Sequence, residues 1–358
     1  HKNTAKAIGE ELGFFGYNMK AIDGVELDTL PDEILEKEVS KIAVYARVSA
    51  EHKLRIVKAW KKQGAVVAMT GDGVNDAPAV KEASIGVSMG ITGTDVTKEA
   101  SDMIITDDNF ASIVSAVEEG RGIYDNIKKS IHYLLSCNAG EIVTMLFASI
   151  FNLPLPLFPI QILWINIATD GLPALALGVD SVAPDIMKKP ARRSTEQIID
   201  RNLGSLIVFQ GFLIALSTLL AYLYVLYYTS SLNPGSLYSW FLNELIPCCF
   251  GGHLSGNLER ARTVAFTVMV VSQLFHSFNC RNAKRSLFEI GVFTNKKLLL
   301  AAGLSLAMQV AIIYIPYSEG IFKVTPLGLK DWIIVFGFSS LIFVIVEIIK
   351  CCKRKSTD

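Results

Sequence analysis

Six apolar stretches, each about twenty residues long, dominate the second half of the chain and limit what it can fold into. A helix of about 20 residues crosses the hydrocarbon core of a bilayer, so each stretch is long enough to span a membrane. Backbone polar groups cannot stay unpaired in hydrocarbon, and helices satisfy them internally. The sequence therefore predicts a six-helix transmembrane bundle, with spans near residues 131–151, 160–179, 204–228, 263–280, 297–316 and 331–350.

The first part of the chain has a different composition, because it is rich in Lys, Glu and Asp up to about residue 130. Of all 358 residues, 51% are hydrophobic and 19% are charged, which is too apolar for an ordinary soluble protein and too charged for one held entirely in lipid. We predict a soluble domain over residues 1–125 and a transmembrane domain over residues 126–358, with membrane lipid as a partner. The formal net charge of zero argues against a nucleic-acid partner.

Short apolar runs alternate with amphipathic stretches between residues 41 and 119. This alternation is typical of βαβ units that form a parallel sheet. The fold class is therefore α/β plus an all-α membrane part, and the last soluble helix is expected to continue into the first membrane span. Strands are expected at 41–47, 65–72, 85–89 and 102–107, and helices at 49–63, 76–83, 94–100 and 109–130.

The lysines and arginines near the ends of the spans predict the orientation of the chain. Cytoplasmic loops of membrane proteins carry an excess of these residues. If the α/β domain is cytoplasmic, the opposite side carries only Arg260, Arg262, Lys323 and Lys330. The C-terminus is then cytoplasmic as well, and the short loops favour the plasma membrane of a bacterium. The cytoplasmic side carries Lys128, Lys129, Lys188, Lys189, Arg192, Arg193, Arg201, Arg281, Lys284, Arg285, Lys296, Lys297, Lys350, Lys353, Arg354 and Lys355.

The cysteines and the first residue exclude some classes of protein. The spacing of the cysteines predicts neither a zinc site nor a disulfide framework. The chain starts at His1 rather than Met, and residues 1–13 have the pattern of a helix entered in the middle of a domain, so a fragment of a longer protein is expected. The six cysteines are Cys137, Cys248, Cys249, Cys280, Cys351 and Cys352.

The loop after the second predicted strand reads AMTGDGVNDAPA, residues 68–79. Asp72 lies at the carboxyl end of that strand, where ligands bind in open parallel sheets. Gly71 and Gly73 let the backbone approach an anion, and Asp76 could share a Mg²⁺ ion with Asp72, with Asn75 as a neutral donor. The pattern predicts a phosphate-handling loop, and the alternative is a turn with solvated side chains.

Lys53 opens the helix that precedes this loop in the sequence. A lysine at the edge of a sheet could neutralise the charge of a phosphate group. Taken alone, such a lysine would be a solvated helix residue, so its assignment depends on the neighbouring loop.

The second apolar segment carries polar groups in its middle. Asn166, Thr169 and Asp170 follow at the spacing i, i+3 and i+4, which places their oxygens on one helix face. Gly171 and Pro173 favour local unwinding, which would free backbone carbonyls towards the same place. Carboxylates inside a membrane are expensive and indicate a functional site.

The first apolar segment carries a matching pair, Asn138 and Glu141, at i and i+3. A short proline-rich linker, residues 152–159, makes the two segments neighbours. Together they offer carboxylate, amide and hydroxyl oxygens, the ligands that Ca²⁺ takes in groups of 6–8. The alternative is a set of hydrogen bonds that only packs helices together.

These motifs resemble those of the P-type ion-pumping ATPases, whose phosphorylation domain is of the haloacid-dehalogenase type. The matching segments read MTGDGVNDAPAVKEASIGVSMG, residues 69–90, and ARVSAEHKLRIV, residues 46–57. The resemblance implies that Asp72 is a Mg²⁺ ligand, that Asn75 and Asp76 are phosphate-site partners, and that Lys53 is the phosphate-site lysine.

The membrane segments are similar to the fifth and sixth transmembrane helices of type II calcium pumps of the sarcoplasmic reticulum kind. They read CNAGEIVTMLF, residues 137–147, and LPLPLFPIQILWINIATDGLPALALGVD, residues 153–180. The resemblance implies that Ca²⁺ is coordinated by Asn138, Glu141, Asn166, Thr169 and Asp170.

One position departs from the pattern of the pumps that carry two Ca²⁺ ions. Their eighth membrane helix supplies a glutamate, and the matching stretch VVSQLFHSFN, residues 270–279, offers Gln273 instead. This departure puts the second transported ion in doubt. The alternative role of Gln273 is a hydrogen bond between helices, and His276 and Asn279 in the same stretch are expected to be packing or interface groups.

The resemblance implies ATP-driven Ca²⁺ transport through a phosphoenzyme, with Mg²⁺ as cofactor, ATP as substrate and protons in exchange. The DKTGT and TGE motifs of the family are absent from the sequence. An actuator domain, a nucleotide-binding domain and four further helices would belong to an N-terminal part, and this chain alone should not hydrolyse ATP. The alternatives are a pump for Na⁺, H⁺ or Mn²⁺, a membrane-anchored dehalogenase-type phosphatase and a non-catalytic membrane adaptor.

Overall fold

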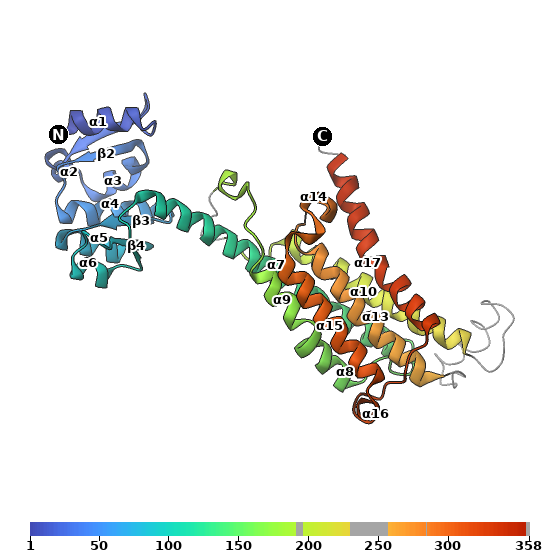
Figure 1. Ribbon diagram of the computed structural model, residues 1–358. Coiled ribbons are helices and arrows are strands. Elements are labelled where there is room, and N and C mark those ends of the chain that lie inside the picture. The colour runs from blue at the N-terminus through green and yellow to red at the C-terminus, as the bar shows by residue number, and fades with distance from the viewer. Residues whose placement is uncertain (191–195, 230–256, 284, 356–358) are drawn as a thin grey trace. The chain divides into compact units, whose positions relative to one another are not determined.

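The computed structural model describes residues 1–190, 196–229, 257–283 and 285–355. It divides into two compact units, which are His1–Glu119 with Met187–Glu196, and Gly120–Ile186 with Gln197–Asp358 (Figure 1). Some residues used in the sequence analysis lie outside the described residues. They are Arg192, Arg193, Lys284, Cys248 and Cys249.

The first unit contains two small parallel sheets with helices between the strands. One sheet pairs β1 with β2, and the other has the order β3-β4-β5. The strands are β1 Lys20–Asp23, β2 Ile42–Ala46, β3 Ala68–Gly71, β4 Ile85–Met89 and β5 Met103–Ile105. The helices are α1 Lys2–Glu11, α2 Gly24–Thr29, α3 Asp32–Glu38, α4 Ala50–Lys62, α5 Ala77–Glu82 and α6 Asp95–Ala100.

All four strands predicted from the alternating pattern are confirmed, and so is their parallel pairing. The expectation of one sheet is wrong in one respect, because β2 pairs with β1 and not with β3. β1 is only four residues long and begins and ends with a charged residue, so it lacks the apolar pattern by which strands are recognised.

Side-chain caps fix where the helices around the loop that follows β3 begin. Ser49 and His52 form a reciprocal pair of side chain to backbone hydrogen bonds at the start of α4. Thr94 accepts a hydrogen bond from the amide of Thr97 at the start of α6. Such caps satisfy amides that have no partner within the helix, so they set the first turn that carries Lys53.

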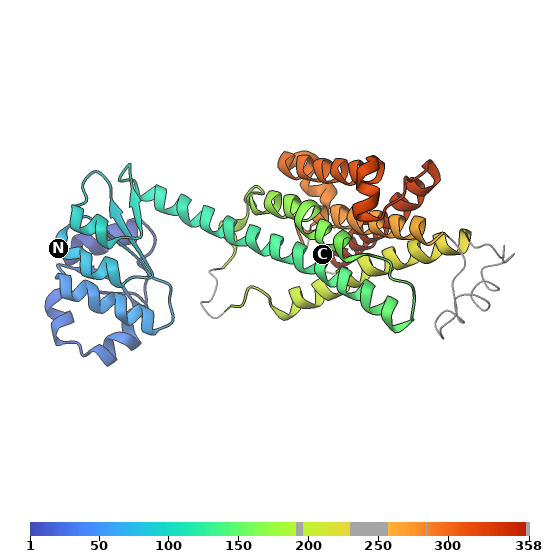
Figure 2. The same cartoon turned by 90° about the horizontal axis from the view of Figure 1, so that it is seen from below.

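The second unit is a bundle of long helices. α7, Phe110–Ile150, begins in the first unit and runs without a break for 41 residues, which confirms the predicted continuity (Figure 2). The chain then forms α8 Pro159–Trp164, a π-helix Ile165–Thr169 and α9 Gly171–Gly178. The remaining helices are α10 Arg201–Tyr228, α13 Leu258–Asn279, α14 Leu287–Ile290, α15 Lys296–Tyr314, α16 Pro316–Phe322 and α17 Leu329–Lys355.

Five helical segments among the described residues are long and apolar enough to cross a membrane. They are Phe110–Ile150, Pro159–Gly178, Arg201–Tyr228, Lys296–Tyr314 and Leu329–Cys352. The remaining predicted span corresponds to α13, which is not among them because it carries charged residues at its start and polar residues along its length. The protein is thus an integral membrane protein, while the sixth span stays a prediction.

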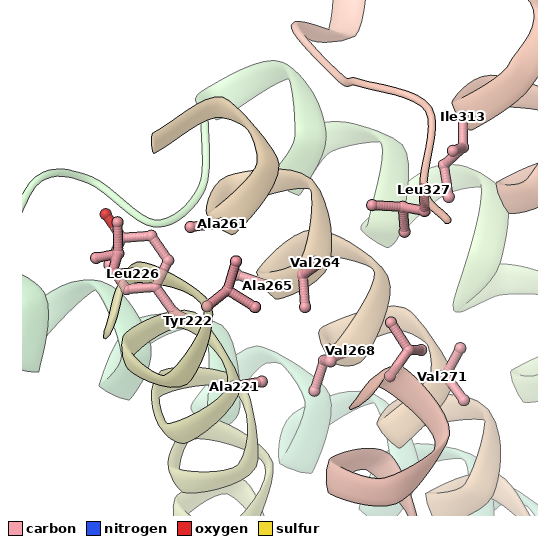
Figure 3. Packing of buried hydrophobic residues seen from close by; sticks show 12 residues of the cluster. Ala221, Tyr222, Leu226, Ala261, Val264, Ala265, Val268, Val271, Ile313 and Leu327 are labelled. Carbon is pink, nitrogen blue, oxygen red and sulfur yellow. The ribbon is translucent and has the colours of Figure 1, made fainter. Parts of the chain in front are cut away.

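α13 forms the centre of the bundle, and 16 of its 22 residues are buried. It packs against both α10 and α17. Val264, Val268 and Val271 lie along α13 within one apolar cluster, which also includes Tyr222 and Leu226 of α10 (Figure 3). A helix surrounded by other helices does not need a lipid-facing surface, so it can carry polar side chains that a lipid-exposed helix would not tolerate.

Close contact between α7 and α10 depends on two glycines. A Cβ atom on Gly211 would lie 2.6 Å from the Cβ of Ala139, and one on Gly140 would lie 2.9 Å from a methyl carbon of Ile214. Small residues at a helix crossing allow backbones to approach closely, as is common in membrane bundles. This crossing lies directly beside Glu141 and therefore helps to position it.

Candidate functional site

The loop that follows β3 is held in place by the start of α6. The amide of Thr94 donates to the carbonyl of Asp72 at 2.9 Å, and the hydroxyl of Thr97 donates to the carbonyl of Gly73 at 2.8 Å. A Cβ on Gly71 would lie 2.5 Å from the Cβ of Asp76, so only glycine fits where the chain turns back on itself. The conformation of this turn is therefore fixed by hydrogen bonds to α6, and it requires glycine at position 71.

The structure brings Lys53 and Asp76 together, as the sequence motifs suggested. The ammonium of Lys53 donates to the carboxylate of Asp76, whose side chain is 8% exposed. Burial of the carboxyl raises its pKa, but the bond from Lys53 and the backbone amides of the loop outweigh burial, so the pKa of Asp76 lies below its ordinary value. Asp76 therefore stays ionised and fixes the position of Lys53.

Asp72 and Asn75 are exposed, and Asp72 directly follows the carboxyl end of β3. Because Lys53 occupies the carboxylate of Asp76, Asp72 is the loop carboxylate that remains open to a ligand. An exposed carboxylate beside a lysine and a glycine-rich turn fits a Mg²⁺ ion with a phosphate group. The residues present therefore fit the cofactor that the sequence analysis predicted.

Glu141 is the centre of the polar cluster in the membrane unit. One of its oxygens accepts from the side-chain amide of Asn166 at 2.9 Å, and the other accepts from that of Gln273 at 3.2 Å. Glu141 and Gln273 are 5% and 0% exposed. Side chains from α7, the π-helix and α13 thus meet at one carboxylate, and Gln273 is part of the cluster.

Asp170 is buried and lies four residues after Asn166 in the chain, and one of its carboxylate oxygens has no hydrogen-bond partner. The hydroxyl of Tyr133 donates to Oδ1 of Asp170 at 3.1 Å, while Oδ2 is buried without a hydrogen-bond partner. Oε1 of Gln273 is also buried without a partner. Buried acceptors are rarely left unpaired unless a group that is absent satisfies them. Two such acceptor oxygens are what a bound cation would use.

The expected unwinding near Gly171 takes a different form, because the chain stays helical and widens into a π turn. The amide of Asp170 donates to the carbonyl of Ile165, five residues earlier, at 2.9 Å. Pro173 has no amide hydrogen for the carbonyl of Thr169, which accepts instead from the hydroxyl of Ser305 at 3.1 Å. The π turn is typical of functional positions in helices.

The structure leaves two predicted ligands at the edge of the hydrogen-bonded cluster. The hydroxyl of Thr169 donates to the carbonyl of Ile165 at 3.0 Å and keeps its lone pairs. Asn138 is partly buried one turn before Glu141 and takes part in no hydrogen bond between described side chains. Asn279, expected as a packing group, donates to the carbonyl of Ile342 at 3.5 Å.

Tyr133 and Ser305 contact the cluster and were not predicted. Tyr133 lies eight residues before Glu141, which is two helical steps of four and therefore the same face of α7. Ser305 is a lone hydroxyl in an apolar run of α15. The spacing of Tyr133 and the single hydroxyl of Ser305 could have indicated both residues, but a carboxylate inside a membrane segment is a stronger indication of a site.

Comparison with known proteins places the chain in a family. The family described as "Cation transporting ATPase, C-terminus" matches residues 154–352, which is more than half of the chain. The chain belongs to this family of cation-transporting ATPases.

Relatives within the ATPase family match nearly the whole length of this chain. It is 48% identical to Calcium-transporting ATPase 1 of Bacillus cereus, over 99% of this chain and 39% of the relative. It is 47% identical to Calcium-transporting ATPase of Bacillus subtilis, over 95% of this chain and 35% of the relative. It is 38% identical to Calcium-transporting ATPase type 2C member 1 of Mus musculus, over 99% of this chain and 36% of the relative. The resemblance to calcium-transporting ATPases is confirmed, and the chain spans little more than a third of each of these relatives.

Proposed function

We propose that this chain is the C-terminal part of a pump that moves Ca²⁺ across a membrane, driven by ATP through a phosphoenzyme. The observation that carries the proposal is the meeting of Asn166 and Gln273 at the buried carboxylate of Glu141. The names of the relatives support Ca²⁺ as the transported ion rather than Na⁺, H⁺ or Mn²⁺. Neither a phosphatase nor a non-catalytic adaptor would need such a cluster.

The cluster would accept Ca²⁺ by turning its amides. Asn166 and Gln273 now direct N–H groups at Glu141, and a half-turn of each amide would direct the oxygen inwards instead. Glu141 and Asp170 would then balance the two charges of the ion. Together with oxygens of Thr169 and Asn138, these groups supply the hard ligands that Ca²⁺ requires.

The loop of the first unit would handle the phosphoryl group. Asp72 would hold Mg²⁺, which when bound supplies positive charge against the phosphoryl oxygens, and Asn75 would contact the phosphate. Asp76 would keep the ammonium of Lys53 directed at the same place. We further propose that the unit is of the haloacid-dehalogenase type and covers residues 1–125, before a six-helix membrane domain over 126–358.

α7 offers a physical link between the two activities, because one unbroken helix leaves the phosphate-handling unit and carries Glu141. In the proposed pump, the phosphorylated aspartate, the actuator, the nucleotide-binding domain and four further helices belong to an N-terminal part, so this chain alone would be inactive. Protons would move in exchange for Ca²⁺. The first unit and the C-terminus would lie in the cytoplasm, at a bacterial plasma membrane.

The test is ATP-dependent uptake of radioactive Ca²⁺ by the full-length pump in sealed vesicles, with Asp170→Asn as the variant. We expect uptake in the wild type and its loss in Asp170→Asn. Asp331→Asn is the matched control, since Asp331 is also buried in the bundle but pairs with Arg260. Wild-type ATP hydrolysis that another cation stimulates, without Ca²⁺ uptake, would keep the family and refute the choice of ion.

A further inference from the structure

A second group of metal-ligating side chains lies in the bundle, apart from the cluster at Glu141. It consists of His132 on α7, His276 on α13 and Cys280 at the C-terminal end of α13. One ligand atom from each lies within 4.8 Å of the others, and all three side chains are buried. His276 and Cys280 are four residues apart, so they share one face of the helix and can bind one ion together.

The hydrogen bonds around these side chains suit a metal site. Nε2 of His132 lies 2.5 Å from the side-chain oxygen of Gln210, which fixes the imidazole ring. Sγ of Cys280 lies 3.2 Å from Nε2 of His276, and Nδ1 of His276 is buried without a partner. A hydrogen bond that orients the ring through its other nitrogen is a usual feature of histidines that bind metals.

The packing between the rings holds the ligands in fixed directions. The imidazoles of His132 and His276 meet edge to face, with ring centroids 5.7 Å apart and an angle of 88°. The ring of His276 also stacks on Tyr133, at a centroid distance of 6.1 Å. Because both histidines are already ordered, an ion would not need to reorganise the helices, which favours binding.

Charge decides which ion the three ligands would take. A thiolate carries one negative charge, so a monovalent ion gives a neutral complex and a divalent ion leaves a positive charge in a dry interior, which is costly. Two buried cations near the group are already paired, since Arg281 pairs with Asp180 at 3.2 Å and Lys350 pairs with Glu347 at 2.9 Å. Thiolate and imidazole ligands also favour soft ions over Ca²⁺ or Mg²⁺.

We propose that His132, His276 and Cys280 form a buried site for the soft monovalent cation Cu⁺, in trigonal coordination. The Cys280 thiol loses its proton as the Cu–S bond forms, and one proton leaves for each Cu⁺ that enters. One nitrogen of each imidazole completes the coordination. The bound ion joins α7 to α13 at a point separate from the contact between Glu141 and Gln273.

The experiment uses the full-length protein in which every cysteine except Cys137 and Cys280 is replaced by serine. This background removes the adjacent exposed thiols of Cys351 and Cys352, which would bind Cu⁺ themselves. Under reducing, oxygen-free conditions, Cu⁺ is titrated against a colorimetric chelator, and Ag⁺ serves as a redox-stable competitor. We expect one Cu⁺ per protein, displaced by one Ag⁺.

Three single variants assign the ligands. We expect Cys280→Ser and His276→Gln each to weaken Cu⁺ binding by more than tenfold, while Cys137→Ser, which removes the other buried thiol, binds as the background does. X-ray absorption of the unsubstituted background should show one sulfur and two nitrogen neighbours, which keeps the proposal testable if a variant does not fold. Unchanged binding by Cys280→Ser, two sulfur neighbours, or tighter binding of Zn²⁺ than of Ag⁺ would overturn the proposal.

Discussion

The guanidinium of Arg281 donates to the carboxylate of Asp180 at 3.2 Å, and the two side chains are only 2% and 4% exposed. The same carboxylate accepts from Lys129 at 3.2 Å and from the amide of Asn295 at 2.9 Å. Asn126 donates to the backbone carbonyl of Asp180 at 2.7 Å. Through Asp180, the chain after α9 is therefore bonded to α7, to the residue that follows the cap of α13 and to the residue that precedes α15.

Replacing Arg281 by Met should destabilise the membrane unit strongly. The substitution leaves Asp180 buried with less compensation, and removing one partner of a buried pair costs about 3–5 kcal/mol. The remaining bonds from Lys129 and Asn295 place the expected loss at the lower end of that range. The loss is measured as the difference in free energy of unfolding between the wild type and Arg281→Met, by detergent titration of the full-length protein.

Arg285 supplies a matched control for that measurement. It forms an ion pair with Asp185 at 3.1 Å, but the two side chains are 54% and 43% exposed. Exposed pairs contribute about 0–1 kcal/mol, so Arg285→Met should change the free energy of unfolding little. If Arg281→Met and Arg285→Met lowered the free energy of unfolding equally, burial would not explain why the ion pair of Arg281 matters for stability.

The bond between Ser305 and the carbonyl of Thr169 predicts a specific coupling with Pro173. Ser305→Ala leaves a buried carbonyl without a donor, which costs about 1–3 kcal/mol. Pro173→Ala restores an amide hydrogen at the position that the carbonyl of Thr169 would use in an ordinary α-helix. The cost of Ser305→Ala should therefore be smaller in the Pro173→Ala background, as measured by a double-mutant cycle of unfolding free energies. Strict additivity would show that the carbonyl does not depend on Ser305.

Asp108 should make the loop after β4 sensitive to acid. Its carboxylate accepts from the amides of Gly90, Ile91 and Thr92 at 2.6, 3.0 and 2.8 Å. The bond from Ile91 lowers the pKa of Asp108 most, and with those from Thr92 and Gly90 it outweighs partial burial and brings the pKa to about 2. Because the folded pKa lies below the ordinary value of 3.8, the stabilisation is complete above that value and disappears as the pH falls towards 2.

Hydrogen exchange of the amides of Ile91 and Thr92, corrected for the intrinsic rate at each pH, follows this loss, whereas the amide of Gly90 also donates to the carbonyl of Ile105 at 2.8 Å. Protection should fall as the pH drops from above 4 towards 2 in the wild type, and it should be low at every pH in Asp108→Ala. The neighbouring Asp107 accepts from the amide of Asn109 and the hydroxyl of Ser112, so Asp107→Ala should leave the amides of Ile91 and Thr92 protected. Protection that is independent of pH in the wild type would contradict the assignment.

Local patterns in the sequence predicted the elements of this chain well. The spacing of Asn166, Thr169 and Asp170 indicated one helix face, and Asn166 does meet Glu141 of the preceding helix. The continuity of α7 was predictable because no proline interrupts its pattern, and the helix runs through Gly120 and Gly122 without a break. Coordination of Ca²⁺ by these residues stays a prediction.

Contacts that depend on the rotation of one helix against another could not be predicted in the same way. The bond from Tyr133 to Asp170 depends on how α7 is rotated against the following helix, and the spacing of Tyr133 from Glu141 was only a weak signal of it. The spacing between cysteines predicted no zinc site, and the pair formed by His276 and Cys280, four residues apart, does not complete a set of metal ligands by itself. The partner that joins it from outside α13, His132, is 148 residues away in the chain. The pairing of β2 with β1 is non-local in the same sense.

The role of Gln273 can be decided by the sign of one effect. If Gln273 only donates to Glu141, Gln273→Met destabilises the ion-free state and raises the apparent Ca²⁺ affinity of the full-length pump. If its oxygen is a ligand, the same variant removes that ligand and lowers the affinity. We expect the second result, by about tenfold, which corresponds to about 1.4 kcal/mol. The unpartnered buried oxygen of Gln273 is the reason for this expectation.

Two further variants complete the measurement of Ca²⁺-dependent phosphorylation by ATP. Gln273→Glu keeps an oxygen at the same position and should retain Ca²⁺ affinity better than Gln273→Met. Gln309→Met is the matched control, because Gln309 is equally buried but accepts from the indole of Trp164, outside the cluster. Its Ca²⁺ affinity should equal that of the wild type. A raised affinity in Gln273→Met would assign Gln273 to the ion-free state alone and reduce the proposed ligand set to α7 and the π-helix with Asp170.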